Sequence, residues 1–106
     1  MLGILLDNAV DALKDIDDKI ISFEVSEKEN GYIFSIGNPY KYVSYDDISE
    51  WFMLGRSQKG NGRGLGLYHL RCLCEEFDCD IGFRNAEINN GNWIIFTLEI
   101  SKAEDT

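Results

Sequence analysis

The chain has 106 residues and 44% of them are hydrophobic, so it can bury the core of one modest domain spanning residues 1–106. Its net charge of −9 argues against DNA or RNA as a partner, because an acidic surface repels polyanions. No apolar stretch approaches the length of a membrane span, and no signal peptide is recognisable. The first residues already fit the middle of a helix, so we expect the domain to be truncated at its N-terminus.

An amphipathic helix is predicted over residues 2–15. Its apolar residues recur at helical spacing, and they are Leu2, Leu5, Leu6, Ala9 and Leu13. Asn8 and Asp11 lie three residues apart and therefore share one face of this helix. The helix ends in an acidic cluster.

A β-hairpin is predicted next. Apolar and polar residues alternate from Ile21 to Val25, which is typical of a half-buried strand, and they alternate again over residues 32–36. The turn Glu29-Asn30-Gly31 connects the two runs. We expect Gly37-Asn38-Pro39 to end the second strand, because proline cannot donate a backbone hydrogen bond.

A long connection over residues 39–61 follows the hairpin. It is polar and irregular, apart from a short helix expected around residues 46–52. Connections of this length in a compact domain are usually functional lids or mobile segments. Four aromatic side chains in or after it are expected to pack in the core or the lid: Trp51, Phe52, Trp93 and Phe96.

The remaining chain predicts a second long helix over residues 65–77 and two strands near 80–86 and 92–100. A loop containing Asn89-Asn90-Gly91 joins these strands. The order is helix, two strands, connection, helix, two strands. This order predicts an α+β fold, a two-layer α/β sandwich with the helices on one face of a mainly antiparallel sheet.

The most informative segment runs from Gly60 to Leu67 and reads GNGRGLGL. Its glycines occupy alternate positions: Gly60, Gly62, Gly64 and Gly66. A glycine-rich backbone that leads into a helix leaves N–H groups free to bind a phosphate, and the helix dipole adds positive potential. Three basic residues and no acidic ones lie between positions 56 and 63: Arg56, Lys59 and Arg63. The alternative is a flexible loop with ordinary surface charges.

Two asparagines are candidates for the rest of such a site. We interpret Asn8 as an oxygen ligand for Mg²⁺, which prefers a few protein oxygens together with water and phosphate. Asp11 either belongs to this site or lies on the helix surface. Asn38 follows an apolar strand and either recognises the edge of a base or serves as a turn residue.

Other sites are not supported by the sequence. It lacks G-x4-GK[ST], and the glycine run does not fit the dinucleotide pattern G-x-G-x-x-G. Three cysteines form no regular disulfide framework, so we expect reduced thiols. Together with His69 they do not suggest zinc, because Cys72 and Cys74 diverge by about 200° on a helix.

Two motifs resemble those of the GHKL ATPase superfamily. LLDNAVDAL from Leu5 to Leu13 resembles its N box, and GRGLGL from Gly62 to Leu67 resembles its second glycine box. The match is most similar to the quorum-sensing peptide-receptor histidine kinases of Gram-positive bacteria. The resemblance implies a Bergerat-type fold that binds ATP and Mg²⁺.

The resemblance also implies roles for single residues. Asn8 would hold Mg²⁺, and Asn38 would replace the Asp that reads adenine in most members. Lys59 and Gly60 would belong to the lid over ATP. The phosphates would contact the glycine box after Gly62, which comprises Arg63, Gly64, Leu65, Gly66 and Leu67.

Two departures from the family pattern bear on function. Hydrolytic members carry a Glu four residues before the N-box Asn, and this chain has Ile4 there. The first glycine box is reduced to Asn38-Pro39-Tyr40. We therefore expect a kinase that delivers the γ-phosphoryl group of ATP to a histidine on a separate dimerisation domain, and His69 is not that acceptor.

The resemblance further implies a homodimeric full-length protein, a response regulator as downstream partner, and a cytoplasmic domain attached to a membrane-anchored protein. Two alternatives remain at this stage. One is a degenerate module that acts mainly in protein interaction, and the other is a serine kinase of the anti-sigma type.

Overall fold

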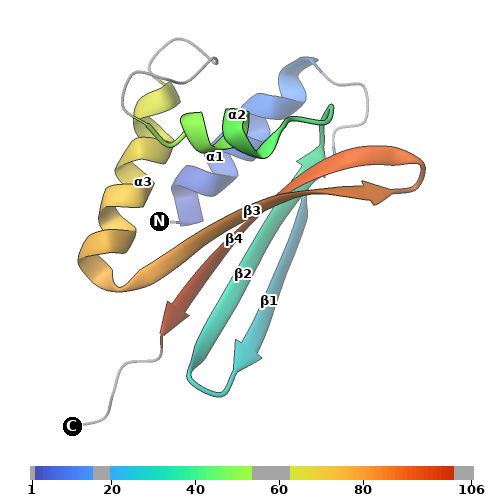
Figure 1. Ribbon diagram of the computed structural model, residues 1–106. Coiled ribbons are helices and arrows are strands. Elements are labelled where there is room, and N and C mark those ends of the chain that lie inside the picture. Colours follow the sequence, from blue (N-terminus) through green and yellow to red (C-terminus); the bar gives the residue numbers. More distant parts are fainter. Residues whose placement is uncertain (1, 16–19, 54–62, 102–106) are drawn as a thin grey trace, which may run out of the picture.

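The computed structural model describes residues 2–15, 20–53 and 63–101. Its elements are α1 (Leu2–Ala12), the 3-10 turn η1 (Leu13–Asp15), β1 (Ser22–Lys28), β2 (Gly31–Pro39), α2 (Tyr45–Glu50), α3 (Arg63–Phe77), β3 (Cys79–Ile88) and β4 (Gly91–Ser101). Figure 1 shows all three helices on the same side of one twisted sheet. The predicted α+β sandwich is confirmed. None of the described helices is long and apolar enough to cross a membrane.

The sheet has the strand order β1-β2-β4-β3, and every neighbouring pair is antiparallel. Alternate residues of each strand point toward the helices. One row of paired residues on this face runs Val25, Phe34, Leu98 and Ile81 across the four strands. The next row contains Ile36 and Phe96, which are 1% and 3% exposed, so the core lies over the central strands.

Both hairpins were predicted, and the second is tighter than expected. Asn89 and Asn90 form a two-residue turn with φ angles of 53° and 66°. Two successive left-handed residues fit the tight turn that matches the twist of a hairpin, and asparagine tolerates this conformation. The strands therefore extend to Ile88 and from Gly91, beyond the predicted boundaries.

The second strand ends at Pro39, within the predicted Gly37-Asn38-Pro39, but these residues do not interrupt its pairing with β4. Asn38 is paired to Ile94 and Pro39 is paired to Trp93. Tyr40 N–H still donates to the carbonyl of Asn92, at 3.0 Å. Because alternate N–H groups point to opposite neighbours, the missing N–H of Pro39 faces the side where β1 is no longer paired.

The core side of α1 and η1 agrees with the predicted periodicity at Leu5, Ala9 and Leu13, which are all buried. Leu6 departs from it, because its side chain is 39% exposed. The other long helix, α3, begins at Arg63, two residues before the predicted start. It ends before Asp78, whose φ of 58° is the left-handed conformation common after a helix.

The predicted lid is wrong for its first half. The segment from Tyr40 to Met53 is packed on the sheet, and its apolar side chains Val43, Ile48, Trp51 and Phe52 are buried. α2 itself was expected, and its N-cap is Ser44, whose hydroxyl accepts a hydrogen bond from Asp47 N–H. Residues 54–62, the second half of the predicted lid, lie outside the described residues.

Aromatic contacts attach this segment to the sheet. Phe52 stacks on Phe83 of β3 with ring centroids 5.5 Å apart, and it also contacts Phe96 of β4 at 6.0 Å. Tyr45 lies 5.0 Å from Phe83. Each such pair adds about 0.5–1.5 kcal/mol beyond the burial of its area.

β1 is more exposed than a half-buried strand should be. Phe23 and Val25 point to the helix side of the sheet, because they pair with Ile36 and Phe34, yet they are 49% and 52% exposed. Alternation in the sequence correctly predicted the strand. It could not show that the described helices cover the central strands and leave this edge open.

Candidate functional site

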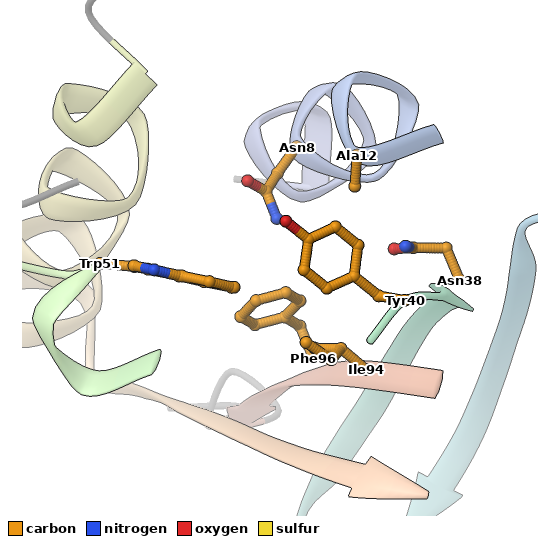
Figure 2. A pocket seen from close by; sticks show the side chains of 7 residues that line it. All are labelled: Asn8, Ala12, Asn38, Tyr40, Trp51, Ile94 and Phe96. Atoms are coloured by element: carbon orange, nitrogen blue, oxygen red, sulfur yellow. The ribbon is translucent and has the colours of Figure 1, made fainter. Parts of the chain in front are cut away.

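A pocket of about 180 Å³ of empty space, partly open to solvent, lies between α1 and the sheet. Figure 2 shows its lining, which consists of Asn8, Ala12, Asn38, Tyr40, Trp51, Ile94 and Phe96. The walls are mainly apolar and aromatic, and two side-chain amides supply polar groups. Small-molecule sites usually have this composition. The 180 Å³ includes space open to solvent, and the enclosed part is too small for a base unless a lining side chain moves.

Four parts of the chain contribute to the pocket. Asn8 and Ala12 lie one turn apart on α1. Ile94 and Phe96 are two residues apart on β4, so both side chains point to the helix side of the sheet. Asn38 comes from the end of β2, directly beside Ile94 in the register. The other two side chains, Tyr40 and Trp51, flank α2.

Asn38 is the one buried polar side chain among the residues that the structure describes, with 3% exposure. Its Nδ2 donates to the carbonyl of Pro39 at 2.9 Å. A side-chain amide carries two N–H groups and an oxygen with two lone pairs, so this bond uses only part of its capacity. The amide therefore fits recognition of a base edge that offers both a donor and an acceptor.

Tyr40 is the aromatic residue closest in sequence to Asn38. Its ring meets Trp51 edge to face, with centroids 6.3 Å apart and planes at 87°. In Figure 2 the ring lies between the two asparagines, with its hydroxyl end directed toward the amide of Asn8. Tyr40 therefore occupies the centre of the pocket lining.

Two further asparagines fix the backbone next to the pocket. Asn85 Nδ2 donates to the carbonyl of Val43 at 2.7 Å, and Asn85 Oδ1 accepts from Val43 N–H at 3.3 Å. Asn92 Nδ2 donates to Asn85 Oδ1 at 2.9 Å and to the carbonyl of Tyr40 at 3.1 Å. These bonds tie the Tyr40–Val43 segment to the β3–β4 hairpin.

The sequence reasoning missed this asparagine pair. The local signal was the Asn89-Asn90-Gly91 turn, which indicates a hairpin but not its partners. Only the register shows that Asn85 and Asn38 both pair with Ile94, on opposite sides of β4.

The glycine box is only partly described. α3 begins at Arg63, so the N–H groups of Arg63 to Leu65 have no acceptor within the helix, and its first turn contains no acidic residue. Gly66 packs on α1, since a Cβ at this position would lie 3.6 Å from Ile4 Cγ2. Lys59, Gly60 and Gly62 lie outside the described residues.

Leu67 places its side chain in the core, where it is 2% exposed. Only its backbone could therefore contribute to a phosphate site. Ile4 is partly buried against the same core, one turn before Asn8 on α1.

Asp11 is not part of the pocket lining. Its carboxylate pairs with Lys14 Nζ at 3.2 Å, and its side chain is 24% exposed. Both interpretations of Asp11 from the sequence stay predictions.

The three cysteines are free thiols on α3 and β3, and they are not among the lining residues. Burial raises the pKa of the Cys74 thiol to about 12, and its hydrogen bond with Cys79 adds to the effect. A thiol with such a pKa is protonated at neutral pH and is a poor nucleophile or metal ligand.

The described residues fit a nucleotide with a magnesium ion. Aromatic walls suit a base, the Asn38 amide suits its edge, and the Asn8 amide oxygen suits Mg²⁺. The start of α3 offers free N–H groups without nearby acidic residues from its own first turn, which suits phosphate.

Comparison with known families agrees with this geometry. A family model described as a GHKL domain matches residues 1–101, almost the whole chain. No curated protein matches the chain significantly.

Proposed function

Because the chain belongs to the GHKL domain family, we propose that it is the ATP-binding catalytic domain of a sensor histidine kinase. GHKL domains bind ATP, generally with Mg²⁺. In this proposal Mg-ATP supplies the activated γ-phosphoryl group, and the acceptor is a histidine on a dimerisation domain outside this chain.

The observation that carries the proposal is the meeting of two amides from distant parts of the chain. Asn8 comes from α1 and Asn38 from the end of β2, and both line one aromatic pocket. A core would favour an apolar side chain at the buried position of Asn38, because a polar group loses hydration when it is buried. Two convergent amides in an aromatic pocket are better explained by ligand recognition.

Each part of the site has a role in this proposal. Asn38 reads the base edge, and the aromatic side chains Tyr40 and Trp51 surround the base. Asn8 offers its amide oxygen to Mg²⁺, and the free N–H groups at the start of α3 hold phosphate oxygens. Catalysis then consists mostly of positioning and charge stabilisation.

Ile4 supports transfer to an acceptor rather than hydrolysis. It occupies the position where the hydrolytic members that the N box resembles carry a Glu, and it is packed against the core and next to Gly66. An aliphatic side chain cannot accept a proton from water. The domain would therefore hold ATP without activating a water molecule through this residue.

Calorimetric titration of Mg-ATP tests the binding part of the proposal. We expect Asn8→Ala and Asn38→Ala to weaken binding by about five- to 100-fold each, which corresponds to the loss of one buried polar partner. Asn30→Ala is the matched control, because Asn30 is exposed in the β1–β2 turn, away from the pocket. Unchanged affinity in both pocket variants would refute the assignment.

Labelling with γ-labelled ATP tests the reaction. Alone, the chain should incorporate no label and release little phosphate. With a histidine-kinase dimerisation domain added, we expect label that is stable to base and labile to acid. Label that survives acid would instead indicate a serine kinase, and rapid phosphate release by the chain alone would contradict the role given to Ile4.

A further inference from the structure

We propose that Asn92, which lies outside the pocket lining, is a positioning residue that sets how Asn38 meets the base. It acts through the peptide unit between Pro39 and Tyr40, whose carbonyl holds the Asn38 amide in one orientation. This orientation presents Oδ1 to the ligand as a hydrogen-bond acceptor. The inference rests on the proposed function, since it concerns the same site.

The Asn38 amide is held by the carbonyl that follows it in the chain. Its Nδ2 donates to the carbonyl of Pro39 at 2.9 Å. The nitrogen of a side-chain amide only donates and the oxygen only accepts, so turning the amide over would place Oδ1 against the Pro39 oxygen. No group of the described residues donates to Oδ1, and Figure 2 shows the amide directed into the pocket. This oxygen is therefore left for a ligand.

The direction of the Pro39 carbonyl is fixed by β4. The Pro39–Tyr40 peptide is trans, so its C=O and N–H point in opposite directions. Tyr40 N–H donates to the carbonyl of Asn92 on β4 at 3.0 Å. The Pro39 carbonyl consequently points away from β4, to the side where β1 is no longer paired and where Asn38 Nδ2 meets it.

The side chain of Asn92 fixes the backbone on the other side of Tyr40. Its Nδ2 donates to the carbonyl of Tyr40 at 3.1 Å and to Asn85 Oδ1 at 2.9 Å. Asn85 is itself oriented by its two bonds to the Val43 backbone. None of these bonds uses a side chain of the pocket lining, so a lining side chain can move to admit a base without breaking them.

This arrangement distinguishes asparagine from aspartate at position 38. Aspartate has nearly the same shape, but it has no donor for the Pro39 carbonyl. We expect Asn38→Asp to weaken Mg-ATP binding by about five- to 100-fold, because a carboxylate oxygen would face the Pro39 oxygen in a buried position. If the bond to Pro39 had no part in recognition, Asn38→Asp would bind Mg-ATP as tightly as the native chain, and that result would overturn the inference.

The role of Asn92 is tested with two ligands, in calorimetric titrations of the full chain. One is Mg-ATP, and the other is magnesium tripolyphosphate, which offers phosphates without a base. Asn92→Asp keeps the shape of the side chain and removes both of its donor bonds. We expect it to weaken Mg-ATP binding by about two- to tenfold and to leave tripolyphosphate binding within about twofold.

Asn90→Asp is the matched control, because it adds the same charge at an exposed turn position of the same hairpin. It should leave both affinities unchanged. If Asn92→Asp does not give a dispersed amide spectrum, Asn92→Ala replaces it, since it removes the donors without adding a charge.

Equal weakening of both ligands in Asn92→Asp would show that this residue only stabilises the fold. That result, or an unchanged affinity for Mg-ATP, would overturn the inference and leave the proposed function intact. Absence of Mg-ATP binding in the native chain would overturn both proposals.

A second readout needs no ligand and decides the question if tripolyphosphate binds too weakly to titrate. Nuclear magnetic resonance measures how fast the side-chain amide hydrogens of Asn38 exchange with water. The hydrogen bonded to Pro39 should exchange slowly in the native chain and in Asn90→Asp, and faster in Asn92→Asp. Equal exchange in all three chains would contradict the positioning role.

Discussion

Asparagine has three different roles in this small domain, and its surroundings decide which one applies. Asn38 is buried in an aromatic pocket, Asn85 and Asn92 bond a loop backbone, and Asn89 and Asn90 adopt left-handed turn conformations. The sequence correctly marked Asn89-Asn90-Gly91 as a connection, because that role depends on local backbone preference. It could not find Asn85, whose partners lie 42 residues away at Val43.

Removal of the Asn85 side chain should destabilise the domain. Asn85→Ala leaves Val43 N–H and C=O without their partner in a largely buried position, which costs about 1–3 kcal/mol. Urea denaturation measures this loss, and the exposed Asn30→Ala serves as control. Equal stability of the two variants would show that water replaces the bonds without cost.

The Cys74 thiol should resist modification and link stability to high pH. Burial raises its pKa from 9.0 to about 12 in the folded chain. Between these pH values the unfolded chain releases this proton and the folded chain keeps it, so the stability contributed by Cys74 falls as pH rises. At pH 8.5, a thiol reagent should modify half-buried Cys72 faster than Cys74. Faster reaction at Cys74 would contradict its burial.

At the scale of elements, local patterns predicted which segments form helices and strands better than they predicted what each one covers. Helical spacing identified α1 and α3, and alternation identified both hairpins. The packed Tyr40–Met53 segment was mistaken for a lid because it has no regular strand or long-helix periodicity. Its apolar residues Ile48, Trp51 and Phe52 nevertheless follow helical spacing and are buried, as is Val43.

Two glycine substitutions should have opposite effects on these elements. Gly66→Ala should stabilise α3 by up to about 1 kcal/mol, because alanine is the better helix former and its Cβ would meet nothing closer than Ile4 at 3.6 Å. Gly31→Ala should destabilise the β1–β2 hairpin, because its Cβ would collide with the backbone carbonyl of Ile100. Thermal unfolding of both variants gives the comparison, and a lower melting temperature for Gly66→Ala would mean that α1 and α3 pack more tightly than described.

At the scale of the whole molecule, the helices cover the central strands and leave β1 open. Ile36 is 1% exposed on β2, whereas its β1 partner Phe23 is 49% exposed on the same face. No periodicity in the sequence distinguishes these positions, because both strands alternate in the same way. The difference depends on where α1 lies over the sheet, which is a tertiary property.

This asymmetry predicts unequal contributions to stability. Ile36→Ala should cost about 2–5 kcal/mol, since it removes a buried side chain from close packing. Phe23→Ala should cost about 1 kcal/mol or less, although the removed side chain is larger. Urea denaturation of both variants measures the free energy of unfolding and tests the open edge. An equal decrease in both variants would show that Phe23 is covered in solution.

The central claim is that α1, the end of β2 and the start of α3 form one nucleotide site. Titration of Mg-ATP followed by ¹H–¹⁵N nuclear magnetic resonance tests it most directly, because the side-chain amides of Asn8 and Asn38 and the backbone N–H of Gly66 each give a separate signal. The account predicts that all three signals move with one shared dissociation constant, while the signals of Asn30 and its neighbours in the β1–β2 turn stay in place. Signals of Asn8 and Asn38 that remain unchanged at saturating Mg-ATP would contradict it.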